Sequence, residues 1–308
     1  MGDAADDFLA IAPEVRAALA EGRAVLALES TIITHGMPFP DNVAMARGVE
    51  AVARAHGAVP ATIAVADGRI RVGLDGAMLD RLGEARGVAK LSRRDLAGAL
   101  AGGGLGGTTV AATMFAAHLA GIGVFSTGGI GGVHRGAEET FDVSADLVEL
   151  ARTPVAVVCA GAKSILDLPK TLEFLETQGV PVIGYGTDAF PAFFARESGL
   201  EVDRRVDGIA DLAAIVDIHR RLGGTGLLVA NPIPEADALP AAEIEARIAE
   251  AVAEAAAAGI ARKDVTPFLL ARIVELTGGR SLAANIALVR NNVAVGADLA
   301  VALARRAG

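Results

Sequence analysis

Two charged side chains follow apolar runs typical of buried strands, and together they could carry acid–base and covalent chemistry. Glu29 comes directly after the run at residues 24–28, in the segment ALEST. In open α/β sheets, ligands bind at the carboxyl ends of strands, where a carboxylate is well placed as a general acid or base. A surface glutamate at a strand end explains this position about equally well.

Lys163 is the more informative of the two residues. The apolar run at residues 155–159 continues through Ala-Gly-Ala directly into this lysine. Burial would remove water from the amine and favour its neutral, nucleophilic form. The alternative is a lysine whose head reaches solvent just past the strand, and this pattern alone slightly favours that alternative.

A glycine-rich loop and a run of carboxylates follow another expected strand. The loop STGGIGGVHRG spans residues 126–136, and its backbone amides could approach a ligand closely. Four carboxylates within nine residues could hold a hard cation such as Mg²⁺ or Mn²⁺, although a solvated loop capped by Ser144 or Asp142 is the commoner arrangement. The four are Glu138, Glu139, Asp142 and Asp146.

A second glycine-rich segment, residues 102–107, formally contains the spacing G-x-G-x-x-G. It is a poor dinucleotide signature because a helix rather than a strand is expected before it. A glycine loop that opens onto a helix N-terminus can still bind one phosphate, with Lys90 as a charge partner. A flexible connection is the alternative.

The five histidines show no metal-binding spacing. His118 lies on an apolar helix and is expected in the core. His35 and His134 lie in loops beside the candidate catalytic groups, so they carry more weight as functional residues.

The composition limits the classes of partner. The chain has 308 residues, 52% of them hydrophobic, and a formal net charge of −9, which disfavours binding of a nucleic-acid polymer but allows a single anionic metabolite. The single cysteine, Cys159, excludes an internal disulfide and a thiolate zinc cluster, and it fits a reducing, cytoplasmic compartment. The acidic N-terminus has no signal-peptide pattern.

Apolar runs and helical patterns alternate along the chain and predict the elements that position these residues. They favour a single α/β domain over residues 1–308, a three-layer α/β/α sandwich with a mostly parallel sheet. Asp67 and Gly68 predict a two-residue hairpin, so the sheet is expected to be mixed. The apolar stretch 108–133 is long enough to cross a membrane, but its glycines favour a buried helix, a strand and a loop instead. Strands are expected at 24–28, 62–66, 123–126, 155–159, 180–184 and 226–229, and helices near 42–56, 109–120, 144–152, 169–178, 208–222, 241–258, 266–277 and 281–305.

Eight segments, in order along nearly the whole chain, resemble the pseudouridine-5'-phosphate glycosidase family, also called the indigoidine synthase A family. The combination is far more specific than any one of its motifs. The segments are LESTIITHGMPFPDN (28–42), VAKLSRRDL (88–96), GGTTVAATM (106–114), FSTGGIGGVHRGAEETFDVSADL (125–147), VVCAGAKSILDLPKTLEFLET (157–177), GYGTDAFPAFF (184–194), NPIPE (231–235) and TGGRSLAANIALVRNN (277–292).

The resemblance implies a role for individual residues. Glu29 matches the family's proton donor, Lys163 its nucleophile and Asp142 its metal-binding aspartate, with one Mn²⁺ per subunit the usual ion. It also implies an α/β/α core and a homotrimer, and at 308 residues we expect no sugar-kinase domain of the kind fused to some relatives. Substrate-binding positions are matched by Lys90, Val110, Ser144, Ala145 and Asp146, and further pocket positions by Thr127, His134 and Asn285.

The reaction that the resemblance implies is the reversible cleavage of the C–C glycosidic bond of pseudouridine 5'-phosphate to uracil and ribose 5-phosphate. It would proceed through a covalent adduct of Lys163 at ribose C1', and the family is classed with the carbon–oxygen lyases. Three other functions stay open: a C-glycosidase or C-glycosynthase with another aglycone, a Schiff-base aldolase acting on a sugar phosphate, and a non-catalytic nucleotide-binding protein.

Overall fold

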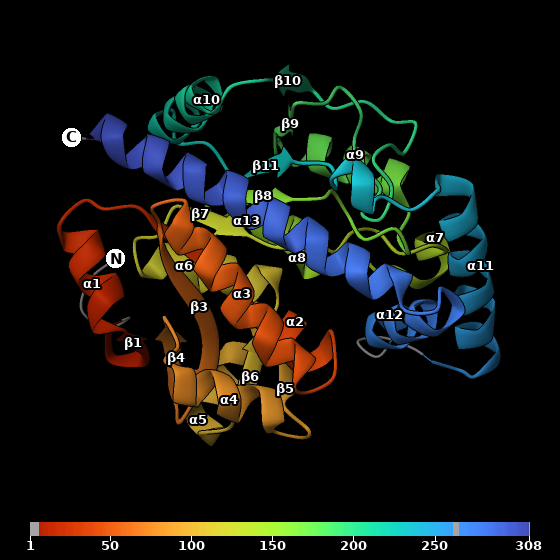
Figure 1. The fold of residues 1–308 in the computed structure, drawn as a ribbon, viewed down its shortest axis with the longest axis horizontal. Coiled ribbons are helices and arrows are strands. Elements are labelled where there is room, and N and C mark those ends of the chain that lie inside the picture. Colours follow the sequence, from red (N-terminus) through yellow and green to blue (C-terminus); the bar gives the residue numbers. More distant parts are fainter. Residues whose placement is uncertain (1–5, 261–264, 308) are drawn as a thin grey trace.

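The computed structural model describes residues 6–260 and 265–307, and these form one eleven-stranded sheet between layers of helices (Figure 1). The strand order is β1-β4-β3-β2-β7-β8-β11-β9-β10, with β6 paired to β3 and β5 to β6. The strands are β1 (Leu9–Ile11), β2 (Val25–Leu28), β3 (Val59–Ala66), β4 (Arg69–Val72), β5 (Ala89–Leu91), β6 (Gly106–Thr108), β7 (Val124–Ser126), β8 (Ala156–Cys159), β9 (Val182–Tyr185), β10 (Arg204–Val206) and β11 (Leu227–Ala230).

The sheet is mixed and mostly parallel, so the predicted fold class is confirmed. Strands β1, β4, β5 and β6 run opposite to the others. The predicted hairpin joins β3 to β4, and both turn residues, Asp67 and Gly68, have positive φ as a two-residue turn of type I′ requires. Strands β2, β3, β8 and β11 are buried along their whole length, as expected for strands covered on both faces.

Helices cover both faces of the sheet, and the eight predicted ones are all present. In Figure 1, α3 and α13 lie side by side in front of the sheet, with α10 beside α13, and α6 and α8 lie behind it. The helices are α1 (Pro13–Ala20), α2 (Thr31–His35), α3 (Asp41–Ala55), α4 (Gly76–Glu84), α5 (Leu96–Gly102), α6 (Val110–Leu119), α7 (Ala137–Thr140), α8 (Ala145–Leu150), α9 (Leu168–Thr177), α10 (Ile209–Arg221), α11 (Ala241–Ala257), α12 (Val265–Leu276) and α13 (Arg280–Ala307), with short 3-10 turns at η1 (Asp6–Phe8), η2 (Arg93–Asp95) and η3 (Glu235–Asp237).

Two apolar segments have the length of a membrane span. The stretch 108–133 divides into α6, β7 and a loop, as predicted. Helix α13 is also long and apolar enough to cross a membrane, but half of its most apolar part is buried inside the protein. It contacts β2, β7 and β8, which is the position of a core helix of a folded domain.

Part of the second glycine segment forms a strand, which corrects the expectation of a flexible or phosphate-binding loop. Residues Gly106–Thr108 are β6, paired with β3 and β5. A Cβ at Gly106 would lie 2.2 Å from a methyl carbon of Leu91, and one at Gly107 would lie 2.4 Å from Oγ1 of Thr34. These glycines therefore allow neighbouring side chains to pack closely against the backbone.

Candidate active site

The candidate site is organised by residues 127–134, which we call the site loop. It follows β7 and continues beside β8, since Thr127 N donates to Val158 O and Ala160 N donates to Gly128 O, at 3.0 and 2.9 Å. Side chains from β2, the end of β8, the start of α8 and helix α13 reach this loop. The loop therefore places groups from distant parts of the chain together.

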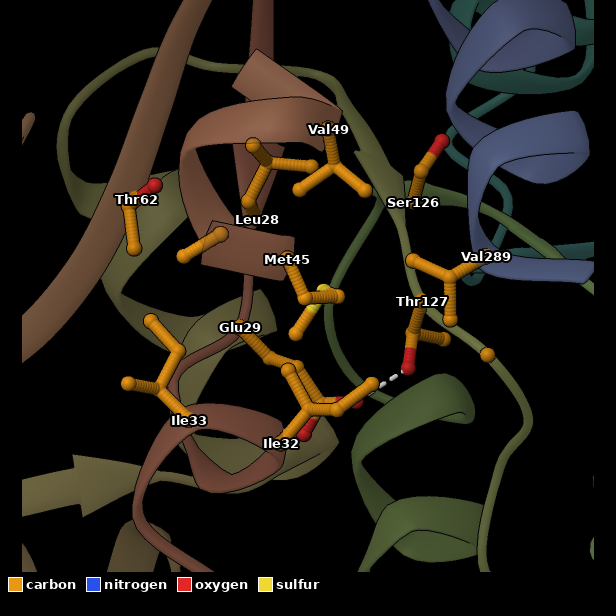
Figure 2. A pocket seen from close by; sticks show the side chains of 12 residues that line it. Leu28, Glu29, Ile32, Ile33, Met45, Val49, Thr62, Ser126, Thr127 and Val289 are labelled. Carbon is orange, nitrogen blue, oxygen red and sulfur yellow. Dashed lines mark hydrogen bonds between the residues drawn. The ribbon is translucent and has the colours of Figure 1, made fainter. Parts of the chain in front are cut away.

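Glu29 lies at the carboxyl end of β2 and points toward the start of the site loop (Figure 2). The hydroxyls of Thr31 and Thr127 donate hydrogen bonds to its two carboxylate oxygens, one to each. Behind it is a small, mainly apolar cavity. The cavity is lined by Leu28, Glu29, Ile32, Ile33, Met45, Ala46, Val49, Thr62, Ser126, Thr127, Gly128 and Val289. A surface glutamate is thereby excluded, because both oxygens are held by neighbours and the side chain is half-buried.

Lys163 approaches the same loop from the end of β8. Its Nζ donates to Gly129 O at 2.6 Å, and its backbone N–H donates to Ile130 O at 3.1 Å. The side chain is half-buried and turns back onto the site loop, which contradicts the alternative of a lysine that escapes into solvent. Glu29 and Lys163 are thus anchored two residues apart, at Thr127 and Gly129.

Asp146 joins the site loop to the beginning of α6. Its side chain is buried, and its two oxygens accept from Ala111 N at 2.9 Å and from Gly131 N at 2.8 Å. Val110 is the first residue of α6 and is buried beside this contact. The carboxylate of Asp146 therefore occupies an amide at the helix N-terminus, where the sequence had suggested that a phosphate could bind.

Ser144 and Ala145 begin α8 next to Asp146. Ser144 caps the helix by accepting from Asp146 N at 3.3 Å, and its backbone N–H donates to Gly132 O at 3.0 Å. Thr108, which follows the second glycine segment, is fully buried and its hydroxyl donates to Ile63 O at 2.7 Å, so this hydroxyl does not bind a phosphate. The hydroxyls near the glycine segment are thus largely used within the fold.

His134 closes the site loop and is influenced by two charged residues. Its backbone N–H donates to Asp142 O at 3.0 Å, and its Nδ1 is 4.0 Å from a carboxylate oxygen of Asp142. Burial lowers the pKa of His134 below its usual value, the negative charge of Asp142 opposes this shift, and the positive charge of Lys90 adds to it. The structure thus brings Lys90, on β5, into the electrostatic environment of the site loop.

Asn285 reaches the loop from α13. Its Oδ1 is buried without a hydrogen-bond partner, and a Cβ at Gly128 would lie 3.3 Å from that atom. An unpaired buried carbonyl oxygen is costly, by about 1–3 kcal/mol, and this oxygen faces the loop between the anchors of Glu29 and Lys163. Asn285 Oδ1 is therefore a buried acceptor beside Gly128 that no described residue uses.

The four carboxylates that could have formed a cation cluster are separated. Glu138 pairs with Lys170 at 2.8 Å, and Asp146 is bound to backbone amides. Within residues 6–260 and 265–307, no group of three or more His, Cys, Asp or Glu side chains is placed to hold a metal. Asp142, whose side chain is 41% exposed, fits only a cation that keeps most of its water and takes one protein carboxylate, as Mg²⁺-type ions commonly do.

Sequence reasoning missed how the site glycines act and wrongly placed His118. A Cβ at Gly129 would meet the ring of Phe193 at 2.6 Å, and one at Gly131 would meet Ser144 Oγ at 2.2 Å. The glycines therefore admit protein side chains. His118 is exposed, because it sits on the last turn of α6 with its side chain toward solvent. The role of Thr31 was also missed, although its place two residues after Glu29 was a usable signal.

Comparison with known proteins gives a consistent result. The model of the family described as "Indigoidine synthase A like protein" matches residues 14–302. A pseudouridine-5'-phosphate glycosidase of Methylobacterium nodulans is 66% identical over 96% of this chain and 88% of its own length, and one of Sorangium cellulosum is 63% identical over 96% and 94%.

Two solved structures share the fold. The prealnumycin C-glycosynthase AlnA, in complex with ribulose 5-phosphate, has a TM-score of 0.91 and 42% identity, covering 98% of this chain and 99% of its own. An indigoidine synthase A-like protein from Thermotoga maritima has a TM-score of 0.86 and 36% identity, with 92% and 94% covered. The chain belongs to the indigoidine synthase A family.

Proposed function

We propose that this protein catalyses the reversible cleavage of pseudouridine 5'-phosphate to uracil and ribose 5-phosphate through a covalent adduct of Lys163 at ribose C1'. The observation that carries the proposal is the anchoring of Glu29 and Lys163 at Thr127 and Gly129 of one loop. The names of the relatives supply the substrate class, and they support an enzyme that breaks a glycosidic bond.

The chemistry explains why a lysine is needed beside the carboxylate. Ordinary glycosidases use two carboxylates, since the leaving oxygen can take a proton. In pseudouridine the ribose is bonded to carbon 5 of uracil, and carbon is a poor leaving atom. An amine bonded to C1' provides the electron pair that forms an iminium on the sugar as the C–C bond breaks.

Four steps balance the reaction. Glu29 donates a proton to the ring oxygen, which opens the ribose, and the Lys163 amine forms a bond to C1'. The Lys163 nitrogen then loses a proton and uracil C5 takes one up, so that the C–C bond breaks and the nitrogen lone pair becomes the C=N bond of an iminium. Water adds to this iminium and releases ribose 5-phosphate and the free amine. Each step can run in reverse.

The remaining groups would bind substrate. Lys90 brings a positive charge to the site loop for the phosphate. Ser144 Oγ accepts from Asp146 N and keeps its own O–H to donate to a phosphate oxygen, and Asn285 has an acceptor for a hydroxyl or N–H. We also propose that Asp142 holds one Mn²⁺, which would supply positive charge near the phosphate when bound. A cytoplasmic homotrimer is the state expected for this enzyme.

A second candidate function is C-glycosynthase activity on another aglycone. The specific observation in its favour is the likeness to AlnA, whose structure contains ribulose 5-phosphate. In this protein both functions would use Lys163 and a sugar phosphate, so the aglycone distinguishes them. Uracil together with ribose 5-phosphate should yield pseudouridine 5'-phosphate if the first function holds.

The test is to incubate the pure protein with pseudouridine 5'-phosphate and Mn²⁺ and to follow free uracil by chromatography. Release of uracil by the wild type and its loss in Glu29→Gln support the proposal. Borohydride added with ribose 5-phosphate should attach the sugar to Lys163, which mass spectrometry of peptides can locate. Uracil release without any trapped adduct would contradict the covalent route.

A further inference from the structure

Asn292 is a fully buried polar side chain that the reaction above does not use. It lies on α13, and its Nδ2 donates to the backbone oxygens of Thr127 at 2.9 Å and of Gly128 at 3.3 Å. These are the first two carbonyls of the site loop. Gly128 O also accepts from Ala160 N, so the stronger and more specific contact of Asn292 is with Thr127.

The orientation of the Asn292 amide is fixed by a second asparagine. Asn231, which follows β11, donates from Nδ2 to Asn292 Oδ1 at 2.9 Å. Asn231 is itself buried, and its backbone N–H donates to Cys159 O at 2.8 Å. Because its oxygen accepts from Asn231, the Asn292 amide must present its NH₂ group to the loop.

Helix α13 must lie close to β7 for this contact to form. Ser126 Oγ donates to the backbone oxygen of Asn292 at 3.0 Å, and a Cβ at Gly296, one helical turn later, would lie 2.0 Å from Ser126 Oγ. A glycine inside a helix is unfavourable by about 1 kcal/mol relative to alanine, so its place here is explained by the close approach of helix and strand.

The contacts form a continuous path to the reacting groups. Asn292 holds the carbonyl of Thr127, the hydroxyl of Thr127 donates to Glu29, and the amine of Lys163 donates to Gly129 O two residues along. We propose that Asn292 is a positioning residue that fixes the Thr127 peptide and, through it, the carboxylate of Glu29. The inference rests on the proposed function and adds a residue outside the pocket on which the position of Glu29 depends.

The sharpest test is Asn292→Asp, which keeps the shape of the side chain. An ionised aspartate donates no hydrogen bond to Thr127 O, whereas a protonated one donates one. We expect kcat to fall by about tenfold to a hundredfold with KM nearly unchanged, because Asn292 does not touch the substrate. The ratio of mutant to wild-type kcat should rise as the pH is lowered and the introduced carboxylate becomes protonated, which a general loss of stability would not produce.

Asn291 provides a matched control. It is the same residue type, is adjacent in sequence and donates to Pro232 O at 3.1 Å, away from the site loop. Asn291→Ala should keep wild-type kcat. If Asn292→Asp does not fold, Asn231→Ala serves instead, since it leaves the Asn292 amide in place but unfixed, and kcat should then fall severalfold.

A double-mutant cycle tests the route through Thr127. If Asn292 acts by fixing Thr127, the loss from Asn292→Asp should shrink markedly in a Thr127→Val background, because the hydrogen bond to Glu29 is already gone. Full additivity would contradict this route. Folded Asn292→Asp or Asn231→Ala with wild-type kcat at all pH values would overturn the proposal.

A measurement without substrate separates this inference from the proposed function. The carboxyl carbon-13 chemical shift of Glu29 should change in Asn292→Asp and stay as in the wild type in Asn291→Ala. A wild-type protein that releases no uracil would refute the proposed function, yet the shift would still report on Asn292. An unchanged shift in an otherwise active enzyme would refute the positioning role alone.

Discussion

The part of the site around Glu29 and Lys163 is held differently from the part around His134. Glu29 and Lys163 lie at the ends of buried parallel strands, and both bond to the buried residues of the site loop. Lys90, by contrast, stands on the three-residue strand β5, and the Asp142 side chain is 41% exposed. The two reacting groups are fixed by hydrogen bonds to the site loop, whereas the Asp142 side chain is open to water.

This difference has an energetic consequence. A hydrogen bond to a charged group inside a protein contributes about 1.5–3 kcal/mol, whereas exposed charge pairs contribute about 0–1 kcal/mol. Changes around Glu29 and Lys163 should therefore alter the chemical step strongly, and changes around His134 should mainly alter binding and titration. Substitutions in the two parts test that division, beginning with the largest expected effect.

Replacement of Lys163 by alanine should lower kcat by at least ~10³-fold, because no other group supplies the electron pair for C–C cleavage. The fold should survive, since the side chain makes one hydrogen bond, to Gly129 O. Uracil release and thermal unfolding should be measured together. Lys170→Ala, at an exposed lysine paired with Glu138, is the control and should keep full activity. Near-normal turnover by Lys163→Ala would remove the covalent mechanism.

The parallel half of the sheet was readable from the sequence, and the other half only partly. Apolar runs in parallel strands are buried on both faces, so β2, β8 and β11 give clear signals. Strands β5 and β6 have three residues each, and β6 contains two glycines, which neither alternation nor propensity can reveal. Their pairing depends on contacts with residues far away in the chain.

The site was predicted in the same uneven way. Residues at strand ends, such as Glu29 and Lys163, follow from the pattern and the family resemblance together. Asn292 lies in the middle of a long helix and directly follows Arg290 and Asn291, so the sequence does not show which of these polar side chains turns into the core. The role of Asn292 depends on the close approach of α13 to β7, which only the three-dimensional structure shows.

Replacement of Lys90 by alanine should lower kcat/KM for pseudouridine 5'-phosphate by about a hundredfold, if this lysine binds the phosphate. The unphosphorylated nucleoside should already be a poor substrate and should lose little more. Arg94→Ala is the control, since Arg94 is exposed on the same segment and should affect neither substrate. Equal losses on both substrates would move Lys90 from the phosphate to the ribose or to the reaction itself.

Asp142→Ala should weaken Mn²⁺ binding by more than about tenfold, because Asp142 is the one carboxylate among the described residues that we place on the ion. Titration of free Mn²⁺ by electron paramagnetic resonance measures this without any turnover. Glu139→Ala, at an exposed carboxylate three residues earlier, should bind Mn²⁺ as the wild type does. Unaltered affinity in Asp142→Ala would place the metal elsewhere or remove it from the mechanism.

The smallest effect, and the most direct measure of the charges around the loop, is the pKa of His134. Burial lowers it first, Asp142 raises it and Lys90 lowers it. Lys90→Met should therefore raise the pKa of His134, and Asp142→Asn should lower it further, as followed by imidazole NMR signals. The imidazole signals of His56, which pairs with Asp298 on the surface, serve as the internal control in both variants.

The same shift predicts how stability depends on pH. Because the pKa of His134 is lower in the folded state than the ordinary value near 6.5, the unfolded chain takes up the proton first as the pH falls. Folding is therefore weakened from about pH 6.5 down to the folded pKa, and His134→Asn should reduce that part of the acid sensitivity. Lys90→Met should narrow the pH interval over which folding is weakened, and Asp142→Asn should widen it. Shifts of the same sign in the two variants would show that Lys90 and Asp142 do not act on the pKa of His134 with opposite charges.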